Sequence, residues 1–171
     1  MILPTTLPGL QRFLGLVASQ QTLHDIHNHT GKVLVQEVNR GFAAERAPDG
    51  RPWIRSASAA RRGGKTLHDT GALQNGITWQ ADSRGVSLKT TGKSNAYAAI
   101  HQYGGSRTNH HGPSGKFRSN RAAAKSPSTT NSVTHGMPAR PFLPEGRLPS
   151  SYTKAINGEL FRYMRQRFGF S

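Results

Sequence analysis

A run of largely apolar residues at three- and four-residue steps constrains this chain most. Between Thr22 and Arg46 these positions are Leu23, Ile26, Thr30, Val33, Leu34, Val38 and Phe42. This spacing places them on one face of an α-helix, and that face must be covered by other parts of the fold. Gly31 and Gly41 each weaken a helix by about 1 kcal/mol relative to alanine, so a kink or break near Gly31 would be consistent with the sequence. The helix should end at Ala47-Pro48-Asp49-Gly50.

Shorter elements follow this helix. Apolar residues at Leu73, Ile77 and Trp79, a turn at 82–85 and renewed alternation over 86–90 predict two strands joined as a β-hairpin. Residues 95–103 have helical spacing before two glycines stop them, so a short helix is expected there.

The C-terminal third combines prolines with another helical pattern. Three prolines within residues 137–144 exclude a central strand but allow an extended edge strand. A final helix is expected from Ser150 or Ser151, either of which could serve as its N-cap. Its inward side is predicted to carry Ile156, Leu160, Tyr163, Met164 and Phe168. The predicted fold is α+β, with a small antiparallel β-sheet packed against a long N-terminal helix and a C-terminal helix, and with a long polar loop insertion.

The length of 171 residues predicts one domain. Residues 1–8 are expected to form an extended arm, with helical spacing from Leu10, so that 1–21 is an arm with a short helix. Residues 22–171 would form the single α+β domain, and the flexible basic insertion 106–136 is too poor in large apolar groups to order itself. No stretch has the length and composition of a signal peptide or a membrane span, so neither is expected. A membrane is not among the partners expected from the motifs below.

The chain is strongly basic, with 23 Lys and Arg residues against 8 Asp and Glu residues and a formal net charge of +15. An acidic partner is therefore expected, and charge alone leaves nucleic acid, an anionic membrane surface and an acidic protein open. Residues 51–65 are expected to form a basic loop. Candidate residues for a partner interface or for contact with DNA in a channel are Arg51, Arg55, Arg61, Arg62, Lys65, Arg107, Lys116, Arg118, Arg121, Lys125 and Arg140. Non-specific nucleic-acid binding through these basic loops stays an alternative function, although each loop has a single aromatic residue, Trp53 or Phe117, and lacks the repeated interleaving of single-strand binders.

The sequence argues against an enzyme. The absence of cysteine excludes disulfides, thiolate nucleophiles and cysteine zinc sites. Asp25 lies among His24, His27 and His29, but no second ligand cluster accompanies them, so no metal site is expected. His68 and Asp69 lack the strained nucleophile turn of a catalytic triad, and residues 62–66 lack the spacing of a phosphate-binding loop. Neither a catalytic site nor a cofactor is predicted.

Four short motifs are more informative in order than any of them alone. They are Ala47-Pro48-Asp49-Gly50-Arg51-Pro52-Trp53, Leu67-His68-Asp69-Thr70-Gly71-Ala72-Leu73, Tyr97-Ala98-Ala99-Ile100-His101-Gln102-Tyr103-Gly104-Gly105 and Met137-Pro138-Ala139-Arg140-Pro141-Phe142-Leu143. Their order and spacing, from about residue 20 to the C-terminus, resemble the phage virion morphogenesis family. The apolar arm before Thr22 and the insertion 106–136 depart from that family's pattern.

The resemblance implies a structural tail-completion or neck subunit, made in the bacterial cytoplasm and built into the virion where the tail joins the head. Its expected partners are copies of itself in a ring, with a hexamer favoured and a dodecamer open. The neighbouring connector or adaptor, the tail tube or the tail terminator and DNA in the channel complete the expected set. The resemblance implies neither a reaction nor a cofactor.

The motif residues are expected to act as parts of a scaffold. They are Pro48, Asp49, Gly50, Trp53, Asp69, Gly71, Leu73, Tyr97, His101, Gln102, Gly104, Gly105, Pro138, Arg140, Pro141 and Phe142. Trp53 is predicted to anchor on the sheet, and Arg140 to face an acidic neighbour. His101 and Gln102 are predicted to bond the adjacent glycine backbone, and contact between subunits stays the alternative role of their motif. Phe142 and Leu143 are predicted to pack inward.

Overall fold

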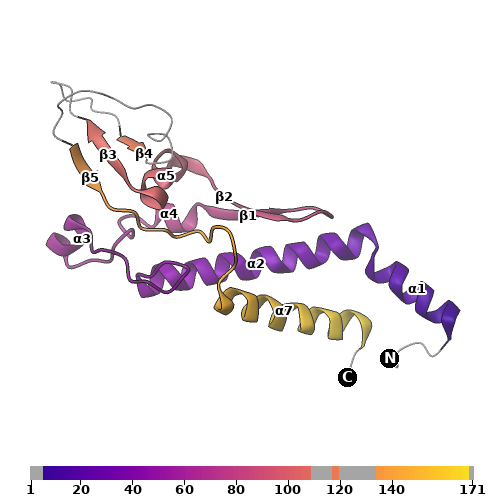
Figure 1. Cartoon of the computed structure of the whole chain (residues 1–171). Coiled ribbons are helices and arrows are strands. Elements are labelled where there is room, and N and C mark those ends of the chain that lie inside the picture. The colour runs from indigo at the N-terminus through magenta and orange to yellow at the C-terminus, as the bar shows by residue number, and fades with distance from the viewer. Residues whose placement is uncertain (1–5, 109–116, 120–133, 170–171) are drawn as a thin grey trace. The chain divides into compact units, whose positions relative to one another are not determined.

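The computed structural model describes residues 6–108, 117–119 and 134–169 (Figure 1). Contacts within the chain group its residues into two compact units. Unit 1 comprises Met1–Glu37, Thr78–Lys89 and Leu148–Ser171, and unit 2 comprises Val38–Ile77 and Thr90–Arg147. The single domain expected from the chain length stays a prediction.

The long helix predicted from apolar spacing is α2, Gln20–Ala44. Ser19 caps its first turn, because the Ser19 hydroxyl accepts a hydrogen bond from the Thr22 amide at 3.2 Å. The helix is continuous through Gly31, so no break occurs there. Its predicted apolar face is buried in both units, at Val33 and Leu34 in unit 1 and at Val38 and Phe42 in unit 2.

Unit 1 begins with α1, Leu7–Val17, which starts earlier than expected. Pro8 lies in its first turn, where the missing N–H of proline removes no helical hydrogen bond, and Thr6 is the N-cap. The prediction that residues 7 and 8 are extended is therefore wrong, and residues 1–5 lie outside the described part of the chain. No side chain of α1 is buried.

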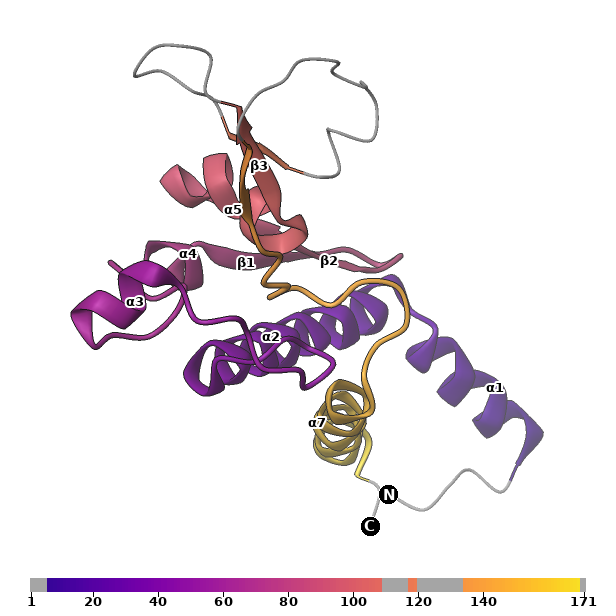
Figure 2. The same ribbon diagram turned by 60° about the vertical axis from the view of Figure 1, so that its left-hand side comes forward.

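The hairpin of unit 1 and the C-terminal helix both pack on α2 (Figures 1 and 2). The hairpin consists of β1, Ile77–Ala81, and β2, Val86–Thr90. Trp79 of β1 donates its indole N–H to Asn28 of α2 at 2.8 Å. The C-terminal helix α7, Ser150–Phe168, reaches α2 through His29, whose Nδ1 lies 2.9 Å from Glu159 Oε1. Pro149 is the N-cap of α7, one residue before the predicted serine.

Gly31 is required by the hairpin and does not interrupt the helix. A Cβ at this position would overlap the indole ring of Trp79. The glycine therefore provides the space in which Trp79 lies against the backbone of α2, and the indole hydrogen bond to Asn28 fixes the ring there. The loss of helix propensity at Gly31 is the cost of this close contact.

Unit 2 contains the remaining elements. These are α3, Ala57–Arg62; α4, Ala72–Asn75; η1, Gly92–Ser94; α5, Asn95–Tyr103; and the strands β3, Gly105–Thr108, β4, Phe117–Ser119, and β5, Thr134–Met137. The three strands form an antiparallel sheet in the order β4-β3-β5, in which Gly105 is opposite both Ser119 and Met137. The short helix predicted over residues 95–103 is confirmed.

Three sequence predictions in unit 2 are wrong. Residues 57–62 of the expected basic loop form α3, because Ser56 caps this helix and the small side chain of Ala59 is buried. Leu73 lies in α4 and not in a strand. The ends of the 106–136 insertion pair as strands, since backbone hydrogen bonding needs no apolar side chains.

The α+β fold is confirmed, with the small hairpin sheet, the long N-terminal helix and the C-terminal helix in the predicted order. The expected inward side of α7 is also confirmed, since Ile156 and Phe168 are buried and Leu160, Tyr163 and Met164 are half-buried. Across the described ranges, no helix combines the length and apolar composition needed to cross a bilayer.

Candidate interaction site

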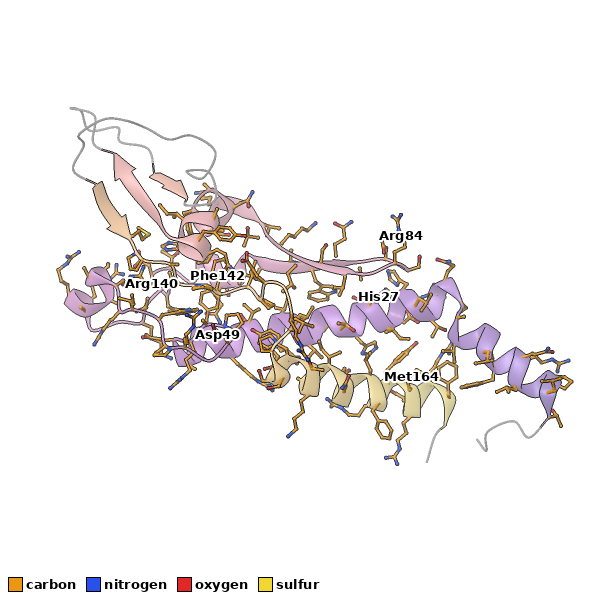
Figure 3. All side chains as sticks on the ribbon, in the orientation of Figure 1. His27, Asp49, Arg84, Arg140, Phe142 and Met164 are labelled. Carbon is orange, nitrogen blue, oxygen red and sulfur yellow. The ribbon has the colours of Figure 1, made fainter. Side chains whose placement is uncertain are left out.

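Three aromatic side chains join distant parts of unit 2. The rings of Phe42 and Trp53 meet edge to face with centroids 5.2 Å apart, and the Phe142 ring lies 5.7 Å from Phe42. The Trp53 indole donates a hydrogen bond to the carbonyl of Pro141 at 2.8 Å. Trp53 therefore anchors on α2 and on residues 137–144, the proline-rich segment. The prediction that it anchors on the sheet is wrong. Figure 3 labels Phe142 and Arg140 in that segment.

Gln102 holds the proline-rich segment in place. Its Oε1 accepts hydrogen bonds from the amides of Phe142 and Leu143, both at 3.0 Å, and its Nε2 donates to the Leu143 carbonyl at 2.9 Å. Prolines keep this segment out of a sheet, so its backbone has no neighbouring strand to bond with. The Gln102 side chain provides the hydrogen bonds that such a strand would provide. The prediction that Gln102 bonds the adjacent glycines is wrong, because its partners lie about 40 residues further along the chain.

Gly104 permits the close approach of this segment to the end of α5. Its φ is +70°, and a Cβ there would lie 2.9 Å from both the Ala139 nitrogen and the Met137 oxygen. Only glycine fits this backbone without displacing main-chain atoms. The Arg140 amide then donates to the His101 carbonyl at 2.7 Å, which continues the contact beyond the sheet.

The turn that follows α2 is held by its own side chains. Asp49 accepts hydrogen bonds from the amide of Arg51 at 3.0 Å and from its guanidinium at 2.7 Å. These bonds hold the pKa of the Asp49 carboxyl below its ordinary value. The chain is thereby directed back toward α2, where the Trp53 amide donates to the Glu45 carbonyl at 2.8 Å. Figure 3 shows Asp49 in this turn.

A second set of contacts ties the segment after α3 to the end of α2. The Thr66 amide donates to the Glu45 carboxylate at 2.9 Å, and Thr66 is fully buried. Lys65 Nζ donates to the Ala43 carbonyl at 3.0 Å. Leu67 follows with a φ of +61°, an uncommon conformation for a side chain of this kind. The second motif therefore starts from a fixed and strained position.

These contacts enclose a cleft of about 670 Å³ that lies wholly within unit 2. One wall is α3 with residues 65–73, and the other is α5 with β5 and Arg140. Its apolar lining includes Leu67, Leu73, Tyr97 and Met137, and its basic lining includes Arg62, Lys65, His68, His101 and Arg140. Three of the four sequence motifs contribute residues to this cleft.

Arg140 and His101 are the most deeply placed charged or titratable groups of the cleft. Arg140 is 5% exposed, and its Nε donates to the Ile54 carbonyl at 2.7 Å. Within the described ranges no acidic side chain pairs with Arg140, so the predicted acidic neighbour is not found inside unit 2. Burial lowers the pKa of Arg140, and burial together with the nearby guanidinium lowers the pKa of His101.

His101 differs from its prediction as well. Its Nδ1 is buried and has no hydrogen-bond partner among the described atoms. Its ring lies against Tyr97, with the centroids 5.8 Å apart and the planes nearly perpendicular. The backbone carbonyl of His101 accepts the hydrogen bond from the proline-rich segment.

The predicted basic residues that the structure describes lie in several places. Arg62, Lys65 and Arg140 line the cleft, and Arg62 pairs with Asp69 at 2.6 Å. Arg51, Arg55 and Arg61 are exposed outside it, and Arg107 and Arg118 lie in β3 and β4. Lys116, Arg121 and Lys125 lie outside the described residues.

The histidines of α2 have ordinary structural contacts. His27 Nδ1 lies 2.6 Å from the Asp82 carbonyl, and His29 pairs with Glu159. In the part of the chain that the structure describes, no three His, Asp or Glu side chains are arranged to hold a metal ion.

Sequence reasoning missed part of the cleft lining. Ser56, Ala57 and Ser58 line the cleft, and no periodic or chemical pattern distinguishes them from loop residues. Leu67 carried a signal only as the first residue of the second motif, because a positive φ in leucine cannot be seen in composition. The joining of α3 to α5 depends on contacts between residues far apart in the chain.

The comparisons with known proteins agree with the motif order. The model of the phage virion morphogenesis family matches residues 8–168, which is nearly the whole chain. Neither curated proteins nor solved structures give a match. The match includes all four motifs and the elements that they join, and it identifies the chain as a virion protein of a bacteriophage. The chain belongs to the phage virion morphogenesis family.

Proposed function

We propose that this chain is a structural tail-completion subunit that forms a ring at the head–tail joint and helps to attach the finished tail to the head. The observation that carries the proposal is the family match over residues 8–168. The motif residues support it, because Trp53, Gln102 and Phe142 are engaged in packing and backbone hydrogen bonds. A building block uses side chains in this way.

Inactivating the gene in the phage that carries it tests this function. The expected result in electron micrographs is filled heads and separate tails that do not join, or tails whose ends are not finished. Expression of the chain from a plasmid should restore joined particles. Intact, infectious particles in the absence of the chain would contradict the proposal.

The proposed ring is a hexamer, with a dodecamer as the alternative. Its subunits would be held by contacts that a monomer leaves open, since closed rings use two different surfaces of each subunit. Native mass spectrometry of the purified chain, alone and after mixing with isolated tails, measures the number of subunits. A strictly monomeric chain that does not associate with tails would contradict the ring.

The basic loops would face either DNA in the channel or acidic surfaces of the neighbouring neck and tail proteins. Exposed Arg51, Arg55 and Arg61 carry positive charge that suits both partners. Contact with phosphates predicts binding that falls steeply with salt concentration, because counterions are released. A mobility-shift titration with duplex DNA at low and physiological salt separates the two, and an absence of any shift at low salt assigns the loops to protein partners.

A further inference from the structure

The cleft of unit 2 contains a positive charge that no acidic side chain of the described residues neutralises. Arg140 is 5% exposed, and among the described residues its guanidinium donates one hydrogen bond, to the neutral carbonyl of Ile54. Burying a guanidinium without a counter-charge is unfavourable by several kcal/mol in general, so such a group is a receptor for an anion when it lines a cleft. His101 lines the same cleft, and its buried Nδ1 has no hydrogen-bond partner among the described residues.

The lining of the cleft favours a carboxylate on a peptide over the phosphates of a nucleic acid. Leu67, Leu73, Tyr97 and Met137 provide apolar walls that would be left without a partner by a phosphate chain. A concave space of about 670 Å³ accepts a few side chains, whereas the phosphates of a duplex lie on a convex surface.

The composition of the chain favours a different protein as the source of the acidic side chain. The chain has 8 acidic residues, and seven of them already make hydrogen bonds, ion pairs or other polar contacts. Glu145 is the one for which no such contact is found in the described ranges. A second copy of the chain therefore offers little acid, and the formal net charge of +15 makes copies repel each other.

We propose that the cleft between α3, residues 65–73 and α5 binds a peptide segment of a different protein, with a glutamate or aspartate on Arg140 and an apolar neighbour against Leu67 and Tyr97. The guanidinium would hold the carboxylate through its remaining N–H groups. That the partner is another virion protein rests on the proposed function, whereas the chemistry of the cleft does not.

Short labelled peptides test this binding in solution. The probes are fluorescein-labelled peptides with a central glutamate flanked by leucine, phenylalanine or tyrosine, with a matched set that has glutamine at the centre. Fluorescence anisotropy with the full-length chain should show saturable binding of glutamate peptides, and at least about tenfold weaker binding of their glutamine partners. Equal affinity for the two sets, or no binding of either at about 1 mM, would overturn the proposal.

Substitutions at Ala57 locate the binding without disturbing the core. Ala57 is exposed, lines the cleft and is the first residue of α3, where an acidic side chain is favourable for the helix. Ala57→Glu should weaken glutamate-peptide binding at least about tenfold, and Ala57→Lys should preserve or strengthen it. Equal effects of the two substitutions would place the binding elsewhere.

A second pair of variants tests Arg140 itself. Arg140→Gln should abolish the preference for glutamate over glutamine, while Arg55→Gln, on an exposed arginine outside the cleft, should leave it unchanged. Circular dichroism checks that each variant is folded. If Arg140→Gln does not fold, the two Ala57 variants decide whether the peptide binds in the cleft. Displacement of the peptide by short duplex DNA, lost in Arg140→Gln and kept in Arg55→Gln, would overturn the peptide assignment in favour of nucleic acid.

These outcomes are separable from the fate of the proposed function. Peptide binding is measured on the purified chain and does not depend on where the chain acts in a particle. A chain that binds glutamate peptides but is dispensable for particle assembly would leave the cleft assignment standing and remove the head–tail role. A chain needed for assembly that shows no preference for glutamate would do the reverse.

Discussion

The large apolar side chains are buried in the aromatic cluster of unit 2, which consists of Phe42, Trp53 and Phe142, and are exposed on α1, the first helix of unit 1. Phe42 and Phe142 are each 2% exposed, whereas Leu7 and Leu14 of α1 are 70% and 54% exposed. The cluster is closed by the chain's own contacts from three sequence motifs. Helix α1 leaves most of its apolar surface uncovered, although its Phe13 ring meets Phe168 of α7 at 5.6 Å. Motif residues thus determine the stability of unit 2, and the leucines of α1 contribute little to that of unit 1.

Removing an aromatic ring from each kind of environment is the largest test of this contrast. Phe142→Ala should lower the free energy of unfolding by about 3–5 kcal/mol, because it opens a cavity beside Phe42. Phe161→Ala is the matched control, since this ring is 62% exposed on α7 and lies in a cation–π contact with Arg165. Its loss should lower the free energy by about 0.5–1 kcal/mol. Urea unfolding followed by tryptophan fluorescence measures both, and similar losses would break the contrast.

The hydrogen bonds of Gln102 are the next test. Gln102→Leu fills the same space but leaves the amides of Phe142 and Leu143 without an acceptor, which should lower the free energy of unfolding by about 2–3 kcal/mol. Gln80→Leu removes an exposed glutamine whose contact is with Lys89, and it should change stability by less than about 0.5 kcal/mol. A loss below about 1 kcal/mol for Gln102→Leu would show that the proline-rich segment is held by its side chains alone.

The sequence predicted the features that follow from local patterns, which are the long helices and the inward side chains. Apolar spacing located α2, α5 and α7 to within a few residues, because a helix is periodic in its own sequence. It also placed Phe42 and Phe142 inward. The partners of Gln102 and Arg140 could not be predicted, since they are backbone groups about 40 and 86 residues away that any sequence would offer. The cleft depends on these pairings and was therefore missed.

The predictions for the short elements α3, β3 and β5 were wrong for a related reason. Ala59 is 1% exposed although it looks like an unremarkable loop residue, because burial of a small side chain depends on what packs against it. Strands β3 and β5 lie at the two ends of a polar insertion, and only their pairing makes them strands. Local patterns could not predict these contacts. The order of the motifs nevertheless predicted the family.

Adding one methyl group at a tightly packed glycine and at an open glycine compares buried and exposed sites more finely. Gly31→Ala places a methyl group into the Trp79 indole and should lower the free energy of unfolding by about 1–3 kcal/mol, despite the better helix propensity of alanine. Gly158→Ala, in α7 with no atom within 4 Å of the new Cβ, should raise it by up to about 1 kcal/mol. Thermal unfolding measures both, and stabilisation by Gly31→Ala would show that Trp79 does not depend on this space.

The smallest expected effect belongs to the leucines of α1. Leu14→Gln and Leu16→Gln replace side chains that are 54% and 58% exposed, so each should change the free energy of unfolding by less than about 0.5 kcal/mol. The measurement is made at low and high protein concentration, because apolar groups that are open in the monomer become sensitive to substitution once they are covered by another chain. A loss above about 1 kcal/mol at high concentration only would show that association covers α1. The same loss at both concentrations would mean that α1 is buried within the monomer, and the contrast with the aromatic cluster would no longer hold.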